Sequence, residues 1–152
     1  LPAHTNPEVN YMNDIEMLKC IAQNAEMGCQ GVTAVRKRID NKAVDNLLCT
    51  QLTRYGKIYH AAGKMLRNRG ESVRHISPMA KTMTRISAQV DLRRDNTPSH
   101  VAEMMIKGST MGVNKLVHNL REYDRGDSSV TLLAKKLLDT EEEHIRELRA
   151  FV

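Results

Sequence analysis

The sequence predicts an all-α protein whose four long helices pack as a bundle, and three observations lead to this prediction. Apolar residues recur every three or four positions along most of the chain, which is the spacing of one helix face. Aromatic residues make up only 3%, and nine methionines suggest an aliphatic, adaptable core. Helix start and stop signals then divide this pattern into separate helices.

The chain has 152 residues, which suits a single domain with a core of its own. Residues 1–12 contain two prolines and no periodic apolar pattern, so we expect an extended N-terminal arm. The single helical bundle domain is predicted over residues 13–152.

The first long helix is predicted over about residues 14–38 and the second from about residue 44 to a stop signal at Gly70. Asn13 followed by Glu16 has the form of a capping box with Asn as the cap. The inner stripe of the second helix contains Gln51 and Tyr55 among aliphatic residues.

Ser77-Pro78 and Thr97-Pro98 both place a capping residue before proline at the first helical position. The first signal starts a short third helix over about residues 79–90, and the second starts a long helix that reaches Tyr123. Ser128 or Ser129 is expected to cap the last helix, whose inner stripe ends at Phe151.

Tight turns near residues 40 and 126 predict two antiparallel helical hairpins. The segment 71–97 must join them. The expected fold is therefore a four-helix bundle of two hairpins joined by a crossover that contains the short extra helix.

The last helix carries the motif Glu141-x-x-His144 on its inner stripe. With the order hairpin, crossover, hairpin, this motif resembles the ferritin-like superfamily over about residues 13–152, and in particular its small bacterial ferritin-like and coat-protein-like families. Metal-binding members supply one Glu from the first and third long helices and Glu-x-x-His from the second and fourth. The resemblance thus implies the position of a di-metal site.

The ligand set that the resemblance implies is incomplete in this chain. The first helix offers Glu26, and the level opposite it in the second helix presents Gln51, Arg54 and Tyr55 instead of Glu-x-x-His. The third long helix has no Glu opposite Glu141, where the sequence reads Gly108-Ser109-Thr110-Met111-Gly112. Only Glu26, Glu141 and His144 remain as ligands.

Two interpretations of these residues follow, and the sequence favours the first. A buried polar cluster can satisfy itself by hydrogen bonds and charge pairing, with a guanidinium in place of metal; its members are Glu26, Arg54, Tyr55, Glu141 and His144. The chain is then a non-catalytic structural or interaction module with a degenerate metal site and no cofactor. The alternative is an oxidoreductase or iron-handling protein that binds Fe, Mn or Zn through Glu26, Glu141 and His144.

Gly108 and Gly112 lie four residues apart on one face of the predicted third long helix. Glycine inside a helix costs up to ~1 kcal/mol relative to alanine, so two on one face indicate a packing reason. The first interpretation is close helix approach. The alternative is a small cavity that faces His144.

The net charge of +5 is unevenly distributed. Residues 54–94 contain ten Lys and Arg against only Glu71 and Asp91, so this basic region is a second alternative site, for an anion or a nucleic acid. No phosphate-binding loop or nucleophile motif accompanies it.

No apolar run approaches the ~18 residues of a membrane span, so no membrane partner is expected. Cys20, Cys29 and Cys49 lack metal-ligand spacing and are interpreted as reduced thiols. With no signal-peptide pattern, they favour a cytoplasmic protein. Bundles of this type often pair through exposed helix faces, so a homodimer is a further expectation.

Overall fold

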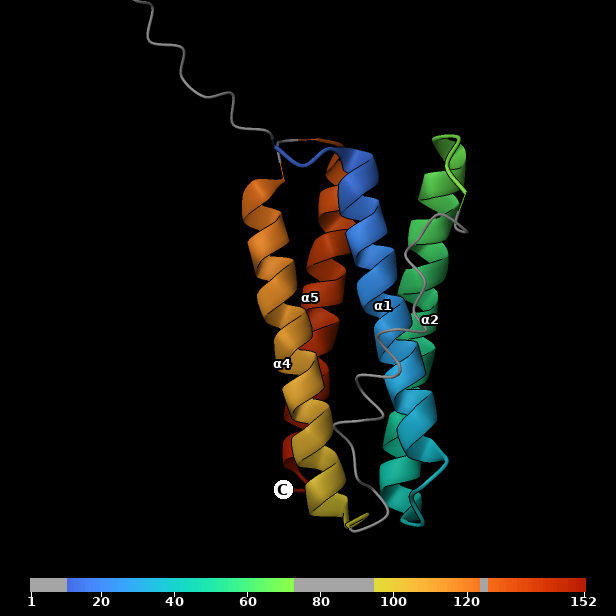
Figure 1. Cartoon of the computed structure of the whole chain (residues 1–152), viewed down its shortest axis with the longest axis vertical. Coiled ribbons are helices and arrows are strands. Elements are labelled where there is room, and N and C mark those ends of the chain that lie inside the picture. Colours follow the sequence, from blue (N-terminus) through green and yellow to red (C-terminus); the bar gives the residue numbers. More distant parts are fainter. Residues whose placement is uncertain (1–10, 73–94, 124–125) are drawn as a thin grey trace, which may run out of the picture.

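The computed structural model describes residues 11–72, 95–123 and 126–152, which form four long α-helices. These are α1 (Asp14–Arg36), α2 (Lys42–Asn68), α4 (Pro98–Glu122) and α5 (Ser128–Arg149). Figure 1 shows them side by side in one bundle. The described residues contain no β-strand, so the predicted all-α four-helix bundle is confirmed. The expected short helix over 79–90 and residues 1–10 of the expected arm lie outside the described residues.

Local sequence signals set most helix ends. Asn13 and Glu16 form both hydrogen bonds of the predicted capping box at the start of α1. Thr97 caps α4 directly before Pro98, also as predicted. At the end of α2, Gly70 adopts a φ of +75°, a left-handed conformation that favours glycine.

The cap of α5 differs from the prediction. The carboxylate of Asp127, and neither Ser128 nor Ser129, accepts the backbone N–H of Ser129 at 2.8 Å. The same carboxylate is held from the other side by Arg69, whose Nη2 lies 2.9 Å from Oδ2. This contact with the end of α2 favours Asp127 as the cap.

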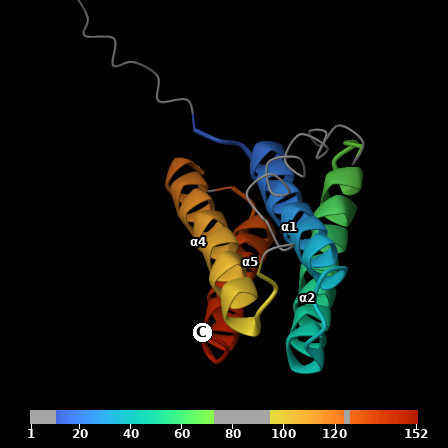
Figure 2. The same cartoon turned by 60° about the horizontal axis from the view of Figure 1, so that its bottom comes forward.

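The helices form two antiparallel hairpins, α1–α2 and α4–α5, which lie against each other in Figures 1 and 2. The Arg69–Asp127 ion pair places the end of α2 beside the start of α5. At the opposite end of the bundle, Asn96 Nδ2 donates to the carbonyl oxygen of Arg38. Helices α2 and α4 therefore run in the same direction, and the end of α2 and the start of α4 lie at opposite ends of the bundle.

The core runs along the axis of the bundle and is largely aliphatic. Every helix contributes fully buried side chains to it, among them Leu18, Leu48, Leu116 and Leu137. None of the described helices is both long and apolar enough to cross a membrane.

Candidate functional site

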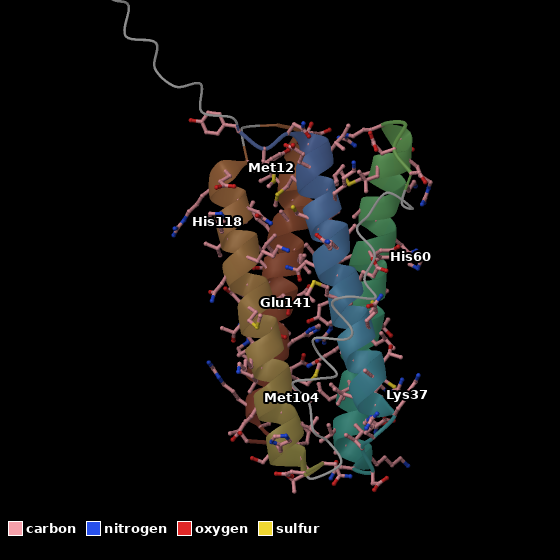
Figure 3. All side chains as sticks on the ribbon, viewed as in Figure 1. Met12, Lys37, His60, Met104, His118 and Glu141 are labelled. Carbon is pink, nitrogen blue, oxygen red and sulfur yellow. The ribbon has the colours of Figure 1, made fainter. Side chains whose placement is uncertain are left out.

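A group of buried polar side chains interrupts this aliphatic core. It consists of Gln51 and Tyr55 from α2, Ser109 from α4, and Glu141 and His144 from α5, and we call it the polar core cluster. Glu141 is 2% exposed and His144 is 0% exposed. In Figure 3, Glu141 lies between the helices, well inside the bundle.

The helical repeat brings these residues together. Gln51 and Tyr55 are one turn apart and share the inner face of α2, while Glu141 and His144 are three apart on the inner face of α5. The burial that the sequence predicts for the Glu141-x-x-His144 motif is thus observed. Because a buried carboxylate or imidazole loses its hydration, the partners of both groups decide their chemistry.

Tyr55 and Glu141 form the main hydrogen bond of the cluster. The Tyr55 hydroxyl donates to Glu141 Oε2 at 2.7 Å, and Ser109 Oγ lies 3.5 Å from the same hydroxyl. Burial, followed by the nearby Glu141 carboxylate, raises the pKa of Tyr55 well above its usual value. Tyr55 therefore keeps its proton at neutral pH and acts as a donor.

Burial also changes the protonation of Glu141. Loss of hydration raises its pKa from 4.5 to about 7, although the hydroxyls of Tyr55 and Ser109 oppose this change. Glu141 is thus divided between its acid and carboxylate forms near neutral pH.

His144 has no polar partner in the described part of the chain. Its ring packs edge-on against the Tyr55 ring, with 4.7 Å between centroids, and neither ring nitrogen forms a hydrogen bond there. Burial, followed by the charge of Arg54, lowers the pKa of His144 from 6.5 to about 4. The imidazole is therefore neutral at pH 7.

Two glycines make room for the cluster. A Cβ atom on Gly28 of α1 would lie 2.6 Å from carbon atoms of the Tyr55 ring. A Cβ atom on Gly112 of α4 would lie 3.1 Å from Glu141 Oε1 and 3.2 Å from Asn24 Oδ1. Asn24 also donates through Nδ2 to the Gly112 carbonyl at 3.2 Å, which joins α1 to α4.

The structure brings together only part of the predicted polar cluster. Tyr55, Glu141 and His144 meet as described above, but Arg54 does not pair with Glu26. Arg54 Nη1 instead lies 2.6 Å from Oε1 of Glu147 on α5. Equal height along a hairpin does not fix the direction of a side chain around its helix, and Arg54 points toward α5.

Glu26 lies outside the polar core cluster. Its Oε1 accepts a hydrogen bond from Gln30 of the same helix at 3.3 Å. Burial is the largest cause of the raised pKa values of Cys29 and Tyr59, and the charge of Glu26 is the second. Glu26 therefore lies near these two side chains. The expected Glu26–Arg54 charge pair is therefore replaced by two separate contacts.

The two glycines of α4 have different surroundings. Gly112 lies against Glu141, as close helix approach predicts. Gly108 is exposed, and among the described residues nothing lies within 4 Å of a Cβ atom placed there.

The donor set does not suit a two-metal centre. Within residues 11–72, 95–123 and 126–152, no three His, Cys, Asp or Glu side chains form a group that could hold a metal ion. This geometry therefore does not assemble Glu26 with Glu141 and His144. The Glu141 carboxylate is instead engaged by the Tyr55 hydroxyl. Two ions need several carboxylates to bridge and neutralise them.

Sequence reasoning did not select Asn24, Gly28 or Ser109 as site residues. Ser109 lies in the segment that the sequence places opposite Glu141, so its position there was a usable signal. Gly28 becomes informative only when Tyr55 is known to lie opposite it. Asn24 donates to the backbone carbonyl of Gly112, and the pattern of side chains in a sequence does not reveal such a contact.

Comparison with known proteins adds no relative. Scans of protein-family models, curated proteins and solved structures find no match to this chain.

Proposed function

We propose that this chain is a ferritin-like bundle in which the polar core cluster stands where metal-binding members of that superfamily hold a di-metal centre. On this proposal the protein is a structural or interaction module rather than a metal-dependent enzyme. The cluster fixes how the two hairpins pack, and the outer helix faces are the surfaces that meet partners.

The observation that carries this proposal is the hydrogen bond from Tyr55 to Glu141. Tyr55 belongs to the helix that should supply Glu-x-x-His, and its hydroxyl engages the carboxylate that a metal would need. A phenol with a raised pKa is a hydrogen-bond donor rather than a ligand at neutral pH. The crossover between parallel helices α2 and α4 supports the ferritin-like part of the proposal.

Metal analysis of the purified protein tests the proposal. After exposure to Fe(II), Mn(II) or Zn(II) and removal of excess ions, we expect far less than a stoichiometric amount of metal and no oxidation of Fe(II) above the buffer rate. The physical reason is the shortage of carboxylates around His144.

The variants Glu141→Ala and Glu142→Ala serve as site and control, because Glu142 is the exposed neighbour on the same helix. The proposal is contradicted if the parent chain and Glu142→Ala each bind two metal ions per chain and Glu141→Ala binds none. Stoichiometric binding of one ion that also requires Glu26 would instead support the alternative of a mononuclear metal protein.

A further inference from the structure

The outward face of α2 carries basic residues and no acidic ones. Lys57, His60, Lys64 and Arg67 are all exposed, and we call them the α2 basic stripe. Their spacing of three, four and three residues puts them along one side of the helix. Figure 3 shows His60 on the side of α2 that faces away from the other helices.

The same face remains free of acids toward the start of the helix. Its exposed positions there are Lys42, Asn46, Thr50 and Thr53. The one acidic residue of α2, Asp45, is turned toward α1, where it pairs with Arg36 at 2.6 Å. No negative charge on α2 therefore offsets the α2 basic stripe.

The stripe's cations are also unpaired within the described ranges. Lys57, Lys64 and Arg67 form no ion pair there, whereas their neighbours Lys19 and Arg69 do. Lys19 pairs with Glu71 and Arg69 pairs with Asp127. The positive charge of the stripe is therefore available to an external anion.

The length of the stripe suits an extended anion. Ten residues separate Lys57 from Arg67, which at the helical rise corresponds to about 15 Å. A small anion would engage one end of this row, whereas a phosphate backbone, with a charge every few ångströms, can meet all of it.

The residues on the outward face of α2 indicate which kind of extended anion it would bind. Docking to a membrane surface or an acidic peptide usually adds apolar or aromatic anchors to the charge. The large exposed apolar side chains of the described residues are Tyr11, Met111, Leu132 and Val152, and none lies on α2. A face of cations and hydroxyl groups matches contacts to phosphates alone.

We propose that the α2 basic stripe binds the phosphate backbone of nucleic acid without reading its sequence. The contacts are ion pairs from Lys57, Lys64 and Arg67 to successive phosphates. This inference does not rest on the proposed role of the polar core cluster, because the stripe lies on the opposite side of α2.

Fluorescence anisotropy with a short labelled DNA duplex, titrated with the full chain in rising KCl, tests the inference. Three phosphate contacts predict a slope of log K against log salt of about −2.7, so binding weakens roughly 40-fold between ~50 and ~200 mM salt. The same measurement with single-stranded RNA and with vesicles containing an anionic lipid separates the sources of phosphate.

The test variant is the triple substitution Lys57→Gln, Lys64→Gln, Arg67→Gln. Its matched control is Lys107→Gln, Lys135→Gln, Lys136→Gln, which removes the same charge from exposed positions of α4 and α5. Thermal unfolding followed by circular dichroism checks that both variants fold.

We expect the stripe variant to lose ten-fold or more in affinity, with its slope reduced by about 2.7, and the control to bind almost like the parent chain. Equal losses in the two variants, no binding at low salt, or binding only to vesicles would overturn the inference. Comparable binding to duplex DNA and single-stranded RNA supports it, because both present the same backbone chemistry.

Discussion

Two neighbouring groups of the polar core cluster have pKa values displaced in opposite directions by the same cause. Burial raises the pKa of Glu141 from 4.5 to about 7 and lowers that of His144 from 6.5 to about 4. In both cases the folded protein prefers the neutral form. At pH 7 the core therefore holds a neutral imidazole and a carboxyl group that is divided between its protonated and ionised forms.

The two displacements act on stability in opposite senses. The contribution of Glu141 is fully present below pH 4.5 and is lost as the pH rises to about 7, because the unfolded chain releases its proton first. The contribution of His144 is fully present above pH 6.5 and is lost as the pH falls to about 4. In the pH range where both groups titrate, their opposite effects on the free energy of unfolding largely cancel.

Replacing Glu141 with Gln should remove the pH dependence of stability that Glu141 causes and leave the opposite one that His144 causes. The parent chain loses the stabilising contribution of Glu141 as the pH rises, and Glu141→Gln does not. We therefore expect the stability of the variant relative to the parent chain to increase by about 3 kcal/mol between pH 4.5 and pH 7. Urea unfolding at a series of pH values measures this difference, in which the remaining carboxylates cancel. Glu142→Gln, at an exposed position, should show a flat difference. A flat difference for Glu141→Gln as well would mean that its pKa is not displaced.

Individual residues were predictable where a helical stripe fixes their direction. The spacing of Glu141 and His144 among aliphatic residues was sufficient to predict their burial, and it is observed. Arg54 was placed only by its height along the hairpin, which left its direction open. Its contact with Glu147 crosses to the other hairpin, so it depends on packing that local spacing does not contain.

At the scale of the element, the helix ends follow local chemistry. Asn13 and Thr97 cap their helices as their sequence context predicts, because each hydrogen bond is made within three residues of the cap. The start of α5 offers adjacent capping candidates in Asp127, Ser128 and Ser129. The ion pair of Asp127 with Arg69 is a long-range contact, and it was invisible in the local pattern.

The packing of α1 against α2 gives a second prediction, at Gly28. A methyl group there would press on the buried Tyr55 ring at 2.6 Å, so we expect Gly28→Ala to destabilise the protein by about 1–3 kcal/mol. Chemical denaturation measures this loss.

Gly31 is the matched control on the same helix, since no described residue has an atom within 4 Å of a Cβ placed there. Gly31→Ala should be stabilising by up to ~1 kcal/mol through helix propensity. Equal effects of the two substitutions would contradict the close approach of α1 to Tyr55.

At the scale of the whole molecule, polar contacts link the hairpins along the bundle. At one end the Tyr123 hydroxyl donates to Asp14, and the backbone N–H of Met12 donates to the carbonyl of Glu122. At the other end Asn96 reaches Arg38. The hairpins are also joined by the buried hydrogen bond from Tyr55 to Glu141 and by the half-buried contacts Asn24–Gly112 and Arg54–Glu147. These contacts therefore join one hairpin to the other at several levels of the bundle.

The topology was predictable because turn positions and helix lengths determine which ends meet. The site was only partly predictable, because its members come from three helices and meet only when all three are correctly rotated about their axes. The sequence indicated a polar core that contains Tyr55, Glu141 and His144, while the pairing of the Tyr55 hydroxyl with Glu141 emerged only from packing. Gly28 provides the space for the Tyr55 ring.

The most direct test of the account is a double-mutant cycle on the Tyr55–Glu141 hydrogen bond, with Tyr55→Phe and Glu141→Gln, measured by urea unfolding at pH 8, above the Glu141 pKa of about 7. If the hydroxyl and the carboxylate stabilise each other across the hairpins, the cycle should give a favourable coupling energy of about 2 kcal/mol. Additive effects, within ~0.5 kcal/mol, would contradict the account, since the two side chains would then be energetically independent.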